Sequence, residues 1–126
     1  MKKVLSIIFI VSVLSAGQLQ WSGNYEKAIA LAKRDAKPVL MMYHASWCPE
    51  CSYMKEVIFK DPKLSDYMQS HFELLAFDIS KDKLPQGYDY KGVPTFYIIS
   101  PDKKLLKKIE GASSAQEFLK KLESVK

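Results

Sequence analysis

Two cysteines three residues apart, Cys48 and Cys51, most constrain what this chain can fold into. They follow an apolar run of strand length, residues 38–43, and precede a helix-compatible run, residues 52–59. At a helix start this spacing places both sulfurs on one face, close enough to bond to each other. The free N–H groups and the dipole of the helix start favour an anion, so Cys48 is the expected thiolate nucleophile. The pattern predicts a redox-active pair in which Cys51 attacks a mixed disulfide formed at Cys48.

The N-terminal residues have the pattern of a secretory signal peptide. Two lysines precede an apolar run, residues 4–14, and the small residues Ser15 and Gly17 then occupy the −3 and −1 positions of a cleavage site. An uncleaved anchor is the alternative, but the apolar run is shorter than the roughly 20 residues that a membrane span needs. We therefore expect residues 1–17 to be a signal peptide and residues 18–126 to be the folded domain of a periplasmic or otherwise exported protein.

Composition limits the classes of partner. A chain of 126 residues with 48% hydrophobic and 26% charged residues is expected to form one domain with an ordinary core. Loss of the two leader lysines lowers the formal net charge from +5 to +3. The remaining lysines are scattered, without the clustered arginines and interleaved aromatic residues of a nucleic-acid surface. We expect a monomer with no nucleic-acid partner.

The order of apolar runs and turn signals predicts an α/β domain. The first two strands are joined through helices and should be parallel, and the lysine-rich last strand should lie at a sheet edge. Met54, Val57 and Ile58 are expected to face the core from the second helix. The expected elements are a helix from the N-cap Asn24 to Lys37-Pro38, a strand over 39–43, a helix opened by Pro49, a short helix from Asp61-Pro62, a strand over 72–79, a loop over 80–91, strands over 95–99 and 104–109, and a helix capped by Ser113 or Ser114.

The segment Trp47-Cys48-Pro49-Glu50-Cys51, the strand before it and the later Gly92-Val93-Pro94-Thr95 resemble the Trp-Cys-x-x-Cys motif and the cis-proline loop of the thioredoxin family. The resemblance extends over most of the chain and is greatest to the secreted branch, including the C-terminal domain of the transmembrane Dsb-type reductase. It implies a thioredoxin fold, with a central mixed sheet of about four strands and helices on both faces. It also implies a thiol:disulfide oxidoreductase.

The same resemblance implies roles for individual residues and partners. The expected partners are a disulfide-containing protein substrate and an upstream thiol donor, a membrane reductase. A cis Val93–Pro94 bond would present the Val93 backbone to an extended substrate. The catalytic residues are Cys48 and Cys51, the substrate-binding residues are Trp47, Val93 and Pro94, and the redox-tuning residues are Pro49 and Glu50.

Three positions bear on mechanism and direction. Strong exported oxidants of this family carry histidine where Glu50 stands, and a carboxylate there disfavours the Cys48 thiolate by like-charge repulsion, which indicates a reductase. Thioredoxins carry a buried aspartate six residues before the first cysteine, where this chain has Met42. His44 replaces a common tryptophan, and both a packing role and a role in proton transfer are open.

Several alternatives are compatible with the same residues. A static Cys48–Cys51 disulfide would close a loop too short to stabilise the fold much. Zinc would need two more ligands, and neither His44 nor His71 lies in a metal-binding motif. Copper delivery through the cysteines and a histidine, a disulfide-donating oxidase and a chaperone using the groove beside Pro94 are the other candidates. We expect no metal and no cofactor beyond the Cys48–Cys51 disulfide.

Overall fold

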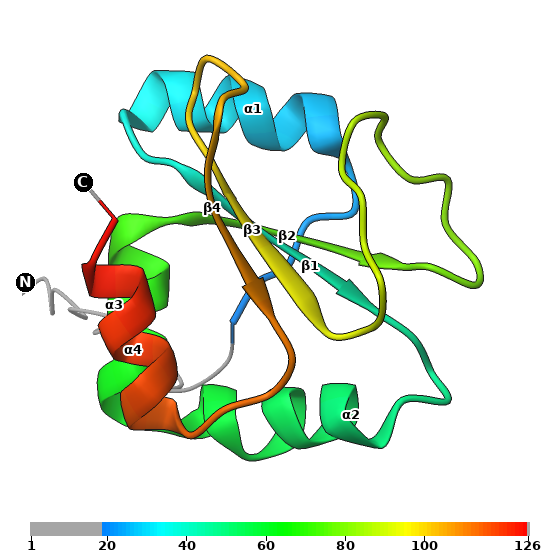
Figure 1. The fold of residues 1–126 in the computed structure, drawn as a ribbon. Coiled ribbons are helices and arrows are strands. Elements are labelled where there is room, and N and C mark those ends of the chain that lie inside the picture. The colour runs from blue at the N-terminus through cyan, green and yellow to red at the C-terminus, as the bar shows by residue number, and fades with distance from the viewer. Residues whose placement is uncertain (1–18, 126) are drawn as a thin grey trace, which may run out of the picture.

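The computed structural model describes residues 19–125, so the expected leader, residues 1–17, lies outside the described residues. The described chain forms one sheet with helices on both of its faces (Figure 1). Within residues 19–125, no helix has the length and apolar character needed to cross a membrane. The elements are α1 (Tyr25–Asp35), β1 (Val39–His44), α2 (Pro49–Glu56), the 3-10 helix η1 (Ile58–Lys60), α3 (Pro62–His71), β2 (Glu73–Asp78), β3 (Thr95–Ile99), β4 (Leu105–Glu110) and α4 (Ala115–Glu123).

The sheet has four strands in the order β2-β1-β3-β4. Strand β1 pairs in parallel with β2 and antiparallel with β3, and β3 pairs antiparallel with β4. This arrangement confirms the predicted thioredoxin fold with a mixed sheet, and it confirms β4 as an edge strand. Because β1 is central and covered on both faces, it is a continuous apolar run rather than an alternating one.

One face of the sheet is covered by α1 and by the long segment 79–94. Helix α1 buries Ala28, Ile29 and Ala32 against this face, as its helical spacing predicts. The side chain of Asn24 accepts a hydrogen bond of 3.0 Å from the Lys27 N–H and caps the helix, a contact that stabilises by about 1 kcal/mol. The helix ends at Asp35, and Ala36 adopts a left-handed conformation directly before Lys37-Pro38, which was predicted to end the helix.

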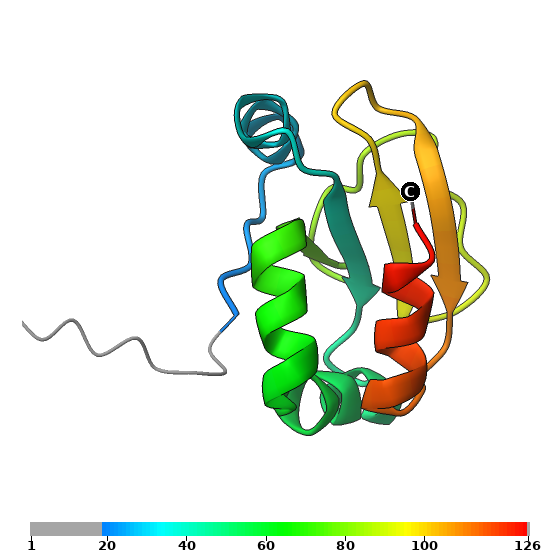
Figure 2. The ribbon, with the colours of Figure 1, turned by 90° about the vertical axis from the view of Figure 1, so that its left-hand side faces the viewer.

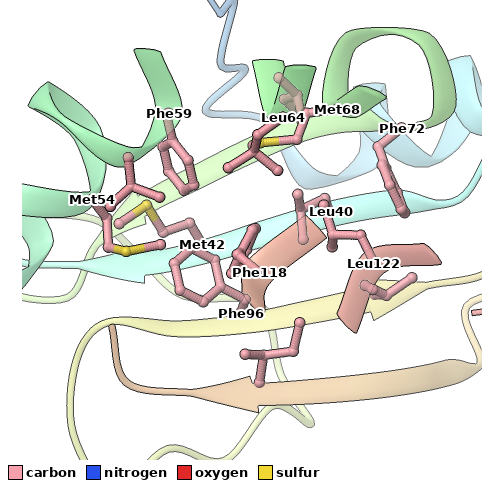
Figure 3. Close-up of a cluster of buried hydrophobic side chains, with 14 of the residues drawn as sticks. Leu40, Met42, Met54, Phe59, Leu64, Met68, Phe72, Phe96, Phe118 and Leu122 are labelled. Carbon is pink, nitrogen blue, oxygen red and sulfur yellow. The ribbon is translucent and has the colours of Figure 1, made fainter. Parts of the chain in front are cut away.

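The opposite face is covered by α2, η1, α3 and α4, and Figure 2 shows α3 and α4 side by side. Its centre is a group of three phenylalanine rings, Phe59, Phe96 and Phe118, with centroids 4.8 to 6.0 Å apart. Figure 3 shows these rings between the sheet and the helices. Each such ring contributes about 1.5–3 kcal/mol through burial of apolar surface. The other labelled members are Leu40, Met42, Met54, Leu64, Met68, Phe72 and Leu122.

The prediction that Val57 faces the core is wrong. Val57 is 53% exposed, whereas Met54 and Ile58 are buried as expected. Helix α2 ends at Glu56 and a 3-10 helix follows, so the helical phase that was extrapolated through Val57 is interrupted there. The tighter turn keeps Ile58 in the core and leaves Val57 at the surface.

Candidate active site

The cysteine pair lies at the start of α2, shortly after the end of β1. After β1 ends at His44, the Cys48 N–H donates to the Ala45 carbonyl over 3.2 Å and closes a turn. Cys48 is the N-cap of α2, and its sulfur accepts a hydrogen bond of 3.1 Å from the Cys51 N–H. Pro49 follows at the first helical position, where its missing N–H leaves no donor unsatisfied. The Cys48 sulfur therefore occupies the position at which a helix start stabilises negative charge.

Cys48 and Cys51 form a disulfide, with their Cα atoms 5.3 Å apart. Both side chains are buried, Cys48 with 4% and Cys51 with 1% of its surface exposed. They belong to the same apolar cluster as Met42 and Met54. The structure thus confirms that the two cysteines lie at bonding distance.

Val93 and Pro94 lie beside the cysteines because of the strand register. Tyr43 near the end of β1 is opposite Thr95 at the start of β3. The residues that follow β1 and those that precede β3 therefore meet at the same end of these two central strands (Figure 1). The Cys48 Sγ atom lies 3.5 Å from the Val93 carbonyl oxygen. The Val93–Pro94 peptide bond is cis, and the Pro94 carbonyl accepts a hydrogen bond of 2.9 Å from the Gly111 N–H.

The remaining predicted site residues lie at the surface around Cys48. Trp47 is 66% exposed, and Pro49 and Glu50 are also exposed, in the first turn of α2. Trp47 therefore presents a large apolar surface to solvent directly next to Cys48. The carboxylate of Glu50 lies within the same turn as the Cys48 sulfur, where its charge can act on a thiolate.

A polar pair formed by the partly buried His44 and the exposed Lys55 lies near the site and was not predicted. The Lys55 Nζ atom is 2.7 Å from the His44 Nδ1 atom. Both line a cavity of about 270 Å³ whose wall also includes Met42, which stands at the position where thioredoxins carry a buried aspartate. The sequence carried a signal, because His44 is two residues after Met42 on β1 and Lys55 is four after Cys51 on α2.

Burial controls the charge of this pair. Burial lowers the pKa of His44, and the neighbouring Lys55 lowers it further, while Asp78 and Asp82 act in the opposite direction. Burial also lowers the pKa of Lys55, and Asp78 opposes this effect. Hydrogen bonds from the hydroxyl and the N–H of Ser80 lower the pKa of Asp78. His44 is therefore held mainly neutral near pH 7.

The second histidine is not part of this arrangement. His71 is exposed on α3, where its ring stacks on Tyr67 with centroids 3.9 Å apart. Among the residues that the structure describes, no group of three or more His, Cys, Asp or Glu side chains could hold a metal ion.

We predict that His44→Gln flattens the dependence of stability on pH. The ordinary pKa of histidine is 6.5, and folding lowers it for His44. Just below that pH the unfolded chain binds a proton that the folded protein does not, so stability falls as the pH falls. In urea unfolding, the free energy of unfolding should therefore fall less in the variant than in the wild type when the pH is lowered from about 7.5 to about 5.5. His71→Gln is the matched control, and an equal response of both variants would contradict the prediction.

Comparison with known proteins agrees with the fold. A family model described as a thioredoxin-like domain matches residues 25–126. The thiol:disulfide interchange protein DsbD of Campylobacter jejuni is 30% identical over 105 residues, which are 79% of this chain and 18% of that protein. Thioredoxin Y of Oryza sativa is 28% identical over 95 residues, which are 75% of this chain and 54% of that protein. The chain thus spans only part of the length of these relatives.

Solved structures show the same fold. A putative disulphide-isomerase from Bacteroides thetaiotaomicron has a TM-score of 0.75 and 27% identity, with 86% of this chain and 93% of that chain covered. The C-terminal domain of DsbD from Neisseria meningitidis in its oxidised form has a TM-score of 0.70 and 19% identity, with 85% and 100% covered. The chain therefore belongs to the thioredoxin-like domain family, and it has the fold and the paired cysteines of a thiol:disulfide oxidoreductase.

Proposed function

We propose that this protein is an exported thiol:disulfide reductase that uses Cys48 as nucleophile and Cys51 as resolving thiol. The observation that carries the proposal is the position of Cys48. Its sulfur caps α2, lies at bonding distance from Cys51 and is 3.5 Å from the Val93 carbonyl. A static disulfide needs none of this, whereas exchange chemistry needs a stabilised thiolate, an adjacent thiol and a surface for the substrate chain.

The exchange proceeds in two balanced steps. The Cys48 thiolate attacks one sulfur of the substrate disulfide, which forms a mixed disulfide and releases the other substrate sulfur as a thiolate. Cys51 then loses its proton and attacks the Cys48 sulfur, which forms the Cys48–Cys51 disulfide and releases the second substrate thiolate. The substrate gains two electrons and the protein loses two. An upstream dithiol donor, which we propose to be a membrane reductase, restores the reduced pair.

Substrate binding is assigned to Trp47, Val93 and Pro94. Trp47 offers an exposed apolar surface, and the backbone at Val93 lies against the Cys48 sulfur. An extended polypeptide beside Val93 would place its disulfide in line with Cys48. The proposed substrate is therefore a protein disulfide on an accessible, extended segment.

The proposals that the protein is exported and that it reduces disulfides rest on the sequence. The pattern of residues 1–17 motivates export, and the names of the DsbD relatives agree with disulfide chemistry. Glu50 motivates the reducing direction, because a negative charge beside Cys48 destabilises the thiolate and so favours loss of electrons from the pair. Pro49 contributes by fixing the first turn of the helix on which Glu50 lies.

We predict that Cys48→Ser lowers the reduction of insulin disulfides by dithiothreitol to the uncatalysed rate. Cys51→Ser should instead accumulate a mixed disulfide between Cys48 and the substrate, because no second thiol resolves it. Non-reducing electrophoresis and mass spectrometry measure the adduct. Catalysis that survives Cys48→Ser would overturn the proposed function, whereas unchanged turnover in Cys51→Ser would overturn only the role of the resolving thiol.

The Glu50→His variant tests whether the cysteine pair is tuned to reduce disulfides. We predict that this change shifts the equilibrium of the pair with glutathione toward a more oxidising potential, by about 30 mV or more, which is a tenfold change in the equilibrium constant. The reason is that a carboxylate near the thiolate is replaced by a group that can carry positive charge. Glu56→His, at the other end of α2, is the control. Equal potentials for the two variants would refute a specific role of Glu50.

A further inference from the structure

The segment that carries Val93 has no helix or strand of its own to hold it. Residues 79–94 connect β2 to β3 as an irregular chain, which lies beside the sheet in Figure 1. Its last residues, Val93 and Pro94, must nevertheless keep a fixed position against Cys48. The contacts that hold this segment therefore decide how the proposed substrate surface is presented.

Two side-chain hydroxyls of β3 hold the segment just before Val93. The Tyr97 hydroxyl donates a hydrogen bond of 2.6 Å to the Asp89 carbonyl. The Thr95 hydroxyl donates one of 2.6 Å to the Gly92 carbonyl. Tyr97 and Thr95 are 1% and 2% exposed, so both donors are fixed within the packed structure. Each bond ties a backbone oxygen of the irregular segment to the rigid centre of the sheet.

Aromatic packing supports the same segment. The ring of Tyr88 packs on Tyr97 with centroids 5.5 Å apart, and its hydroxyl lies 2.7 Å from that of Tyr25 on α1. Tyr90 packs edge-on against Tyr43 of β1, with centroids 5.5 Å apart. Burial raises the pKa of Tyr97 far above its ordinary value, so its hydroxyl is a donor over the whole working pH range.

Tyr43 is a tyrosine of the same aromatic group whose hydroxyl makes no hydrogen bond to the described residues. Its ring is fully buried against Tyr97 and Tyr90. Tyr43 and Tyr97 are thus two buried tyrosines in contact with each other, of which only Tyr97 reaches the backbone of the segment.

We propose that the hydroxyls of Tyr97 and Thr95 are positioning groups for the substrate, because they fix the Asp89 and Gly92 carbonyls and thereby the Val93 backbone beside Cys48. They act through the segment and touch neither sulfur. They therefore set the affinity for a polypeptide disulfide and leave the exchange chemistry at Cys48 unchanged. This inference rests on the proposed function, since it concerns the substrate of that same site.

The test compares a protein disulfide with a small one. Tyr97→Phe and Thr95→Val each remove one hydroxyl and keep the shape of the side chain. We expect KM for insulin to rise about tenfold in each variant, the effect of one lost hydrogen bond on an ordered segment, with kcat within about twofold of the wild type. The rate of the reduced protein with 5,5′-dithiobis(2-nitrobenzoic acid), which needs no extended binding surface, should stay within about twofold of the wild type as well.

Matched variants separate positioning from general damage to the fold. Thr95→Ser keeps the hydroxyl and should restore the wild-type KM. Tyr43→Phe removes a buried hydroxyl that makes no hydrogen bond and should also keep the wild-type KM. Circular dichroism and thermal unfolding confirm that each variant is folded at the assay temperature.

Two results would overturn the inference while the proposed function stands. One is a KM for insulin in Tyr97→Phe and Thr95→Val equal to that of Tyr43→Phe. The other is an equal fall of the insulin and small-disulfide rates, which would mean that the hydroxyls support the cysteine pair itself. A wild-type protein no faster than Cys48→Ser with either disulfide would instead overturn the proposed function, and this inference with it.

Discussion

The pairing of β1 with β3 at the centre of the sheet is the constraint on which the site depends. The antiparallel register sets Tyr43 opposite Thr95, so the residues that follow β1 and those that precede β3 meet at the same end of these two strands. The first carries Cys48 and the second carries Val93, whose carbonyl lies 3.5 Å from the Cys48 sulfur. A shift of one residue in this register would reverse the faces of β3 and separate the two segments.

The energetics of the fold and the chemistry of the site are largely separate. The phenylalanine group of Phe59, Phe96 and Phe118 and the central strand bury the apolar surface that stabilises the domain. The Cys48–Cys51 disulfide closes a loop of very few residues and adds little through chain entropy. In the proposed exchange cycle the pair would therefore open and close while the core keeps the domain folded.

The sequence predicted those features that depend on local pattern. The strands, the cap at Asn24 and the cysteine pair follow from apolar periodicity, capping chemistry and spacing, and the structure agrees with them. Val57 was misplaced because a 3-10 turn interrupts the helical phase after α2. The Lys55–His44 pair and the bond from Tyr97 to the Asp89 carbonyl were not predicted, since they join elements whose relative positions only the fold determines.

The most direct test of the reducing role is the redox state of Cys48 and Cys51 in the intact cell. Rapid acid quenching followed by alkylation of free thiols and mass spectrometry would measure the fraction of the protein with a free pair. A reductase supplied by an upstream donor is expected to be mainly dithiol even in an oxidising compartment, and to become disulfide when that donor is removed. A pair found as disulfide throughout, with or without the donor, would contradict the reducing role and favour a protein that donates disulfides.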